Sequence, residues 1–172
     1  MYFKKLSEDD DVQSFNCGAN EWEKEVSNFL KEDALDQQRI GLNVTWLCYS
    51  DTHELKGYVS LIASSIRIGR GSLWRPWLGI DHVWFEYMPC ILIGQFGVQQ
   101  NEQHQGIGGF MIAWVRGALT ELVMGAKFLT LHVHRENNGG LAFWKKQGFE
   151  VFRPSGGKAP IYMVYDLYST TQ

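Results

Sequence analysis

A glycine-rich segment between an apolar run and an amphipathic run constrains the fold of this chain most. Residues 90–98 are apolar and predict a buried strand, and the polar residues 99–105 predict a loop. A run with helical periodicity begins at Ile107. Gly106 and Gly108 therefore fall where a loop that follows a strand turns into a helix. Glycine lets backbone approach a ligand closely, and the free N–H groups that open a helix attract anions, so the segment predicts a phosphate site.

Two common phosphate loops do not match these residues. A Rossmann fingerprint needs a third glycine at the position of Met111, and a Walker loop needs a Gly-Lys-Ser or Gly-Lys-Thr tripeptide, which this chain lacks. A Gly-x-Gly pattern also occurs in turns that bind nothing. The flanking elements therefore have to decide between a ligand loop and a plain turn.

Length and composition indicate a single globular domain over residues 1–172. Hydrophobic residues make up 45% of the chain and charged residues 20%, which is typical of a folded domain and not of a disordered segment. The net charge is −3 and the isoelectric point is about 5.9. Without a basic field over the whole chain, nucleic acid and acidic membranes are unlikely partners.

Cysteine usage predicts a reduced, cytoplasmic protein without a cysteine-based metal site. Cys17, Cys48 and Cys90 are an odd number of thiols with no close spacing. No apolar run is long enough to span a membrane, and the first residues lack the apolar core of a signal peptide. His132 and His134 share a face of a predicted strand, but no third ligand accompanies them, so we expect no metal.

The remaining pattern predicts alternating strands and helices. Asn20 and Glu23 form a capping-box pattern that opens a helix fading at residues 37–41, and Gly57 marks a bulge. The other expected elements are an edge strand at 2–6, a hairpin of strands 43–50 and 55–68, a strand at 127–134, a helix from Asn137 to Gln147 stopped by Gly148, and a closing hairpin of strands 149–153 and 161–167 around the loop 154–160.

Two further segments complete the pattern. The helix from Ile107 carries an apolar stripe as far as Leu122 and Val123, with Gly125 as its expected stop. Residues 70–87 are rich in tryptophan and tyrosine but have no clear period. Such a segment either packs on itself or walls a pocket, and we favour the pocket because the segment precedes the strand that leads to the glycines.

Two motifs in this order resemble the GNAT family of N-acetyltransferases. Gln103-x-x-Gly106-x-Gly108 resembles the acyl-CoA pyrophosphate loop of that family, [Q/R]-x-x-G-x-[G/A], and residues 137–149 resemble its second signature, N-x-x-A-x-x-[F/L]-Y-x-x-x-G-F. The resemblance covers about residues 6–167. It implies an α+β fold: a single GNAT-like domain with a central, mixed but mostly antiparallel sheet flanked by helices, whose strands splay at an acyl-CoA gap. Phe15-x-Cys17-Gly18 before a helix is similar to bacterial members related to acetyltransferase toxins.

The resemblance also implies which residues bind acetyl-CoA, the expected co-substrate. The backbone of Phe96, Gly97 and Val98 would face the pantetheine arm, and Asn137 and Phe143 would also contact the cofactor. The residues implied at the pyrophosphate are Gln103, His104, Gln105, Gly106, Ile107, Gly108 and Gly109. No metal is implied.

Three departures from the family pattern concern catalysis and packing. Trp144 stands where the family signature has the tyrosine that commonly protonates the thiolate of CoA, and an indole N–H cannot act as a general acid at neutral pH. Leu92 and Gly94 occupy the stretch where many relatives place a basic Glu or His, which leaves Glu86 as a weak candidate base. Gly140 replaces an alanine, which we expect only to loosen packing.

Three functions follow as alternatives. The first is direct transfer of an acetyl group from acetyl-CoA to a primary amine on a small molecule or peptide. The second is a non-catalytic acyl-CoA-binding module, and the third is a toxin-like acetyltransferase of aminoacyl-tRNA. The third would use a local basic patch made of Lys145, Lys146, Arg153 and Lys158. A homodimer is one assembly compatible with the sequence.

Overall fold

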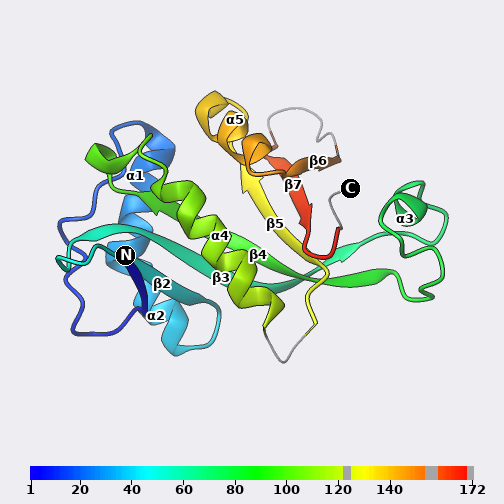
Figure 1. The fold of residues 1–172 in the computed structure, drawn as a ribbon, viewed down its shortest axis with the longest axis horizontal. Helices are drawn as coiled ribbons and strands as arrows, with labels where there is room; N and C mark the ends of the chain where they lie inside the picture. Colours follow the sequence, from blue (N-terminus) through cyan, green and yellow to red (C-terminus); the bar gives the residue numbers. More distant parts are fainter. Residues whose placement is uncertain (122–124, 154–158, 170–172) are drawn as a thin grey trace. The chain divides into compact units, whose positions relative to one another are not determined.

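A computed structural model describes residues 1–121, 125–153 and 159–169, leaving aside the side chains of Trp77 and Arg153. A mixed seven-stranded sheet has the strand order β1-β2-β3-β4-β5-β7-β6. Its strands are β1 (Tyr2–Lys5), β2 (Val44–Tyr49), β3 (Leu55–Arg67), β4 (Tyr87–Val98), β5 (Phe128–Val133), β6 (Glu150–Arg153) and β7 (Ile161–Asp166) (Figure 1). The helices are α1 (Glu21–Asn28), the π-helix η1 (Phe29–Asp33), α2 (Ala34–Arg39), α3 (Trp74–Trp77), the 3-10 helix η2 (Gln100–Glu102), α4 (Ile107–Thr120) and α5 (Asn138–Lys146).

Two compact units make up the chain. Unit 1 comprises residues 1–62 and 93–115, and unit 2 comprises residues 63–92 and 116–172. The long strands β3 and β4 and the helix α4 contribute residues to both units. The expected α+β class with a mixed sheet flanked by helices is confirmed, whereas the boundaries 1–172 for one domain stay a prediction.

Unit 1 is built on the antiparallel strands β1, β2 and β3. Lys5 pairs with Trp46, and Val44 pairs with Leu61 across the β2–β3 hairpin. The register shifts by one residue between the pairs Cys48–Gly57 and Tyr49–Leu55, which confirms the bulge predicted at Gly57. A Cβ atom at Gly57 would come within 2.7 Å of the Gly97 carbonyl oxygen, so this position has no room for a side chain.

Two sets of helices cover the two faces of this part of the sheet. The capping box at α1 is confirmed, because the Asn20 side chain accepts from the backbone N–H of Glu23 while the Glu23 carboxylate accepts from that of Asn20. Leu47, on one face of β2, joins the core formed with the first helices. The next residue toward the N-terminus, Trp46, points to the other face, where it contacts Trp114 of α4 edge-to-face.

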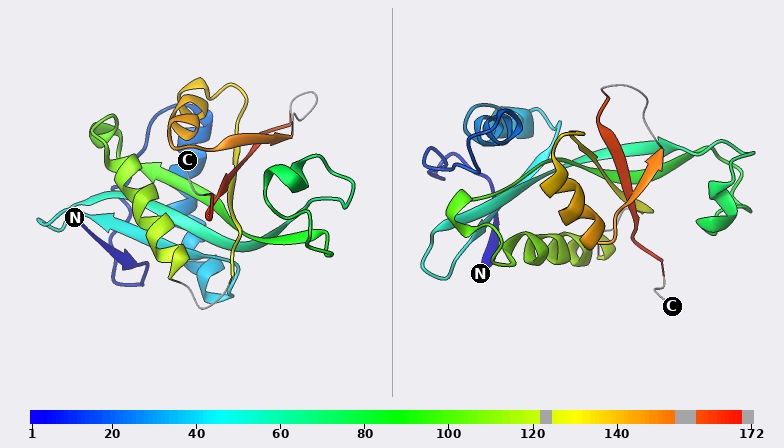
Figure 2. Two further views of the ribbon diagram at one scale, coloured as in Figure 1. Left: turned by 45° about the vertical axis from the view of Figure 1, so that its right-hand side comes forward. Right: turned by 90° about the horizontal axis from the view of Figure 1, so that it is seen from above.

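Unit 2 contains the neighbouring strands β5, β7 and β6, which are coloured yellow to red in Figure 2. β7 pairs antiparallel with both of its neighbours. Gly148, at a φ of +82°, ends the segment containing α5 as predicted, because this left-handed conformation suits glycine. The predicted stripe members Leu122 and Val123, and the loop residues 154–158, lie outside the described residues.

A buried arginine organises the segment between β3 and β4. Arg75 is only 3% exposed and donates to the backbone carbonyls of Ile68, Ile80, Val83 and Phe85. Around it, Trp74 and other apolar residues join the core of unit 2. The segment therefore packs on itself, the alternative that we favoured less from sequence, although some of its aromatic side chains stay exposed.

In the described parts of the chain, the helices are too short or too polar to cross a membrane. Those same residues contain no group of three or more histidine, cysteine, aspartate or glutamate side chains placed to hold a metal ion. His132 packs its ring against Tyr162, with 4.7 Å between the ring centroids.

Candidate functional site

The end of β4 and the start of α4 form the predicted loop-to-helix junction. β4 ends at Val98 and α4 begins at Ile107, with the single turn η2 between them. His104 and Gly106 have positive φ angles of 62° and 87°. The N–H of Phe110 donates to the carbonyl of Gly106 at 3.0 Å, which closes the first turn of α4.

This junction suits an anionic ligand for two reasons. The first N–H groups of a helix have no partner within the helix, and a glycine before the first helical residue has no side chain that could cap them. A Cβ atom at Gly106 would meet nothing within 4 Å, so open space lies beside this turn. The residues therefore fit the pyrophosphate of a CoA ester, which would accept hydrogen bonds from the N–H groups of Gly108 and Gly109.

The remaining predicted cofactor residues of unit 1 lie at the end of β4. Gly97 is packed tightly, because an added Cβ would come within about 3 Å of Val26, Phe15 and Tyr58. The carbonyl of Val98 accepts a hydrogen bond from the Gln103 carboxamide at 3.1 Å. The Gln103 side chain thus binds the protein's own backbone, while His104 and Gln105 are exposed.

Unit 2 carries Asn137 and Phe143. Asn137 caps α5, since its Oδ1 accepts from the backbone N–H of Gly140 at 2.8 Å. A Cβ atom at Gly140 would lie 2.7 Å from Asn137 Nδ2. The expectation that Gly140 only loosens packing is therefore wrong, because the glycine makes room for the Asn137 carboxamide. Phe143 is half-buried on the same helix.

Trp144 lies in an aromatic cluster of unit 2. Its side chain is 8% exposed, and its ring meets the rings of Phe143 and Phe149 edge-to-face at 4.9 and 5.1 Å between centroids. These contacts explain how an indole is accommodated at this helix position. They also show that its ring is largely enclosed by apolar neighbours, as an apolar wall or a core residue would be.

Glu86, the weak candidate base, lies in unit 2 beside two arginines. Its Oε2 accepts from Arg67 Nη2 at 3.0 Å and from Arg67 Nε at 3.2 Å, and its Oε1 lies 4.0 Å from Arg70 Nε. One carboxylate oxygen is therefore engaged by a guanidinium group. The other oxygen, Oε1, lies at the outer limit of ion-pair distance from a second guanidinium group.

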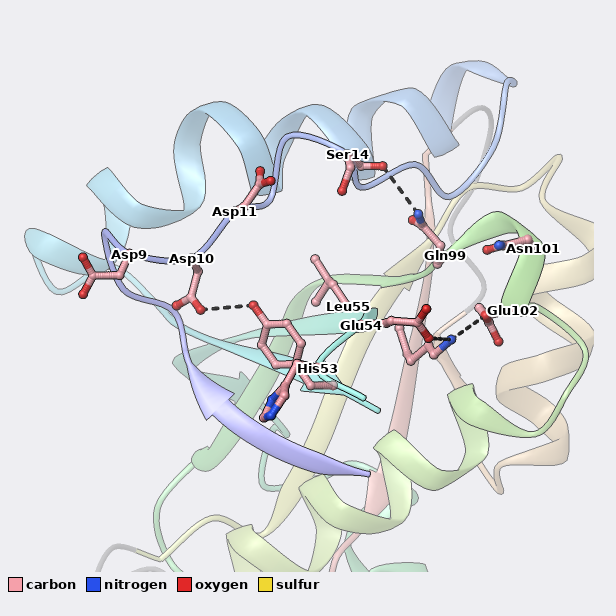
Figure 3. A pocket seen from close by; sticks show the side chains of 12 residues that line it. Asp9, Asp10, Asp11, Ser14, His53, Glu54, Leu55, Gln99, Asn101 and Glu102 are labelled. Carbon is pink, nitrogen blue, oxygen red and sulfur yellow. Dashed lines mark hydrogen bonds and ion pairs between the residues drawn. The ribbon is translucent and has the colours of Figure 1, made fainter. Parts of the chain in front are cut away.

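A surface cavity of about 470 Å³ in unit 1 was not predicted from sequence (Figure 3). It gathers residues near positions 10, 54 and 100 of the chain, which no local pattern connects. Its acidic lining residues are Asp9, Asp10, Asp11, Glu54 and Glu102, and Lys56 bridges the last two at 3.0 and 2.6 Å. Five carboxylates would repel a pyrophosphate, so this cavity does not suit the phosphates of CoA.

Asp10 shows how the edge of this cavity is stabilised. Burial opposes ionisation of its carboxyl, but hydrogen bonds from Lys4, Ser7 and Tyr49 outweigh burial and hold the pKa of Asp10 below its usual value. The hydrogen bond between Tyr49 and Asp10 also affects the tyrosine. The pKa of Tyr49 is raised chiefly by burial and also by its donation to Asp10.

Solved structures share this fold over nearly the whole chain. AtaT complexed with acetyl-methionyl-tRNAfMet has a TM-score of 0.75 at 18% sequence identity, covering 96% of this chain and 94% of that chain. A tyrosine-to-phenylalanine mutant of KacT has a TM-score of 0.75 at 21% identity, with the same coverage. AtaTR bound with AcCoA has a TM-score of 0.72 at 20% identity, covering 96% and 93%. At these identities the likeness establishes the fold.

The family follows from the sequence as a whole. No curated protein matches this chain. The model of the acetyltransferase (GNAT) family matches residues 13–149, which include both the junction at Gly106 and the helix that carries Trp144. This chain therefore belongs to the GNAT family of acetyltransferases and is an acyl-CoA-dependent N-acetyltransferase that uses acetyl-CoA as its co-substrate.

Proposed function

We propose that this acetyltransferase holds the pyrophosphate of acetyl-CoA at Gln103–Gly109 and transfers the acetyl group to a primary amine by direct attack. The observation that supports this most is the turn at Gly106. Its left-handed glycine leads into α4 with open space beside it and with no side-chain cap at that position. The N–H groups of Gly108 and Gly109 would then bind the phosphates through charge-assisted hydrogen bonds.

The pantetheine arm is proposed to bind the backbone of Phe96, Gly97 and Val98. An extended amide arm can pair with strand backbone in the way that a peptide adds to a sheet edge. Asn137 would hydrogen-bond the CoA arm through its Nδ2, because its Oδ1 already caps α5. Phe143, from the next turn of that helix, would supply apolar contact.

The chemical step needs a neutral amine and a stabilised oxyanion. The amine nitrogen attacks the thioester carbonyl, the carbon–sulfur bond breaks, and CoA leaves as a thiolate. A thiolate leaves well without much proton transfer, so Trp144 serves as an apolar wall and not as an acid. A backbone N–H near Val98 would meet the developing oxyanion, and Glu86, through Oε1, is the candidate acceptor of the amine proton.

The acceptor amine divides the proposal into two candidates, a small or peptidyl amine and the amino group of an aminoacyl-tRNA. The second is favoured by the similarity in fold to AtaT, which was solved in complex with acetyl-methionyl-tRNAfMet, and relatives of this fold were also solved with an antitoxin and with DNA. These complexes weigh against the expectation that nucleic acid is an unlikely partner. The net charge of −3 supports the expectation that nucleic acid is not a partner.

The basic patch that an RNA would contact is only partly within the described residues. Lys145 and Lys146 are exposed in the last turn of α5. The side chain of Arg153 and all of Lys158 lie outside the described residues. The two lysines also suit the negative end of the helix, which is an ordinary structural role.

A thiol-release assay distinguishes these candidates. Purified protein with acetyl-CoA should release free CoA when the correct amine is added, and the panel should contain small amines, peptides and aminoacyl-tRNA. Saturating CoA should also raise the melting temperature, because a ligand that binds only the folded state stabilises it. Thermal stabilisation without thiol release from any amine would indicate the non-catalytic binding module. The absence of both would contradict the proposed function.

A further inference from the structure

We propose that residues 14–18, here called the strap, hold the phosphate loop in its binding geometry through Gln103, which acts as a positioning residue. This inference rests on the proposed function, since it concerns the same loop. It adds a role for a segment that precedes α1 and lies more than 80 residues away in sequence. It also assigns the side chain of Gln103 to the support of the loop and not to contact with the cofactor.

The carboxamide of Gln103 joins three parts of unit 1. Its Nε2 donates to the carbonyl of Cys17 at 2.6 Å and to the carbonyl of Val98 at 3.1 Å. A carboxamide nitrogen has two hydrogens, so both of its donors are used by backbone. The phosphate loop is thereby tied to the strap on one side and to the end of β4 on the other.

The strap also holds the first half of the loop. The Asn16 backbone N–H donates to Gln99 Oε1 at 2.8 Å, and the Gln100 N–H donates to the Asn16 carbonyl, also at 2.8 Å. Gln99 Nε2 in turn donates to the carbonyl of Ser14, a contact drawn in Figure 3. The loop therefore meets the strap at two places, at Gln99–Gln100 and at Gln103.

The strap is itself anchored in the core of unit 1. The Phe15 side chain is fully buried and meets the Tyr58 ring edge-to-face at 5.3 Å between centroids. The Cys17 N–H donates to Ser27 Oγ at 3.1 Å. These contacts give the strap a fixed position, so hydrogen bonds to it can fix the loop in turn.

The consequence for catalysis is specific. The pyrophosphate does not react, so its contacts are the same in the ground state and the transition state. Loss of loop order should therefore weaken acetyl-CoA binding and raise KM while kcat stays nearly unchanged. A residue that acted in the chemical step would instead lower kcat.

Three variants and a matched control test the positioning role. Gln103→Leu replaces the carboxamide by a shorter apolar side chain and removes both donors, and we expect the Kd for CoA to rise about tenfold. Gln103→Arg supplies N–H donors again and should recover most of the affinity. Asn16→Ala, at an exposed position of the strap, removes the side-chain bonds to Gly18 and Gln100 and should produce a smaller increase.

Gln38→Leu is the control, because the Gln38 carboxamide, like that of Gln103, makes two hydrogen bonds to backbone groups but lies in α2, outside the loop. It is a half-buried glutamine of unit 1 that donates to the Leu6 carbonyl at 2.8 Å and accepts from the Thr45 N–H at 2.9 Å. Its replacement should lower the melting temperature, because two hydrogen bonds to backbone groups are lost. It should leave the Kd for CoA unchanged.

The measurements are the Kd for CoA by calorimetry, KM and kcat for acetyl-CoA, and the melting temperature without ligand. A higher Kd and KM in Gln103→Leu, recovery in Gln103→Arg and no change in Gln38→Leu support the inference. If Gln103→Leu fails to fold, Gln103→Arg and Asn16→Ala decide. Wild-type affinity for CoA in Gln103→Leu or in Asn16→Ala would overturn the inference. So would a folded Gln103→Leu whose affinity for CoA is not exceeded by that of Gln103→Arg. A wild-type protein that does not bind CoA would instead overturn the proposed function.

Discussion

Replacement of Gly106 by alanine should separate the cost of backbone strain from the loss of cofactor binding. Gly106 has a φ of +87°, and a Cβ atom built on it meets nothing within 4 Å. In the protein without ligand, the added methyl group therefore causes no clash. The only expected penalty is the left-handed backbone conformation, which L-residues with a side chain disfavour.

The magnitude of that penalty is small. A left-handed conformation costs an ordinary residue about 1–2 kcal/mol, and the lower entropy of the unfolded alanine chain offsets about 0.4–1 kcal/mol. The net loss of about 1 kcal/mol should lower the melting temperature by about 2–4 °C in a domain of this size. The loss of CoA binding should be larger, since one charge-assisted hydrogen bond contributes about 1.5–3 kcal/mol, or about ten- to hundredfold in Kd.

Gly41 provides the matched control. It follows α2 in unit 1 with a φ of +78°, and a Cβ there also meets nothing within 4 Å. Gly41→Ala should lower the melting temperature as Gly106→Ala does, but it should not change the Kd for CoA in calorimetry. Equal and wild-type affinities in both variants would refute the reasoning, because they would show that no ligand occupies the space beside Gly106.

Three further predictions concern Trp144 and Gly140 of unit 2 and the buried thiol of Cys48. Trp144→Phe should keep most of the kcat because shape and apolarity are retained, and a loss of several orders of magnitude in kcat would contradict the role as an apolar wall. Trp144→Ala should instead destabilise the protein by about 3–5 kcal/mol in chemical denaturation. Gly140→Ala should displace the Asn137 carboxamide and weaken CoA binding while stability changes by about 1 kcal/mol or less, since better helix propensity offsets the lost cap; unchanged calorimetric affinity would argue against Asn137 as a CoA ligand. Burial raises the pKa of the Cys48 thiol to about 11, so the stability that the protonated thiol contributes should be complete below about pH 8.5, the usual pKa of a thiol, and should be lost as the pH rises towards 11. In chemical denaturation, Cys48→Ala should lose less free energy of unfolding over that pH range than the wild type, and identical pH profiles would contradict this.

Local sequence patterns predicted most of the elements because their signals are local. The capping box of Asn20 and Glu23 and the stop at Gly148 act within one or two turns of a helix, so neighbouring residues are sufficient to recognise them. The bulge at Gly57 was recognised because a glycine interrupted a strand pattern. The loop at Gly106 was recognised because a strand, a polar segment and a helix follow one another there.

The segment between β3 and β4 resisted prediction for a physical reason. Its aromatic residues indicated burial somewhere, but no periodicity indicated which side chains turn inward. The structure buries Arg75, a residue type that is rarely buried, and satisfies its guanidinium with backbone carbonyls of the same segment. Such an arrangement depends on the path of the chain and not on the neighbours of the arginine in sequence.

The sequence by itself determined the family, the order of strands and helices, and the position of the glycine-rich loop between β4 and α4, because these depend on local periodicity, caps and glycine spacing. Only the tertiary structure decided which distant residues contact that loop. Gln103 meets the carbonyl of Cys17 across 86 positions of sequence, and the acidic cavity joins three segments near positions 10, 54 and 100. Hydrogen bonds between distant segments depend on sheet register and on the anchoring of Phe15 in the core, and no local pattern encodes them.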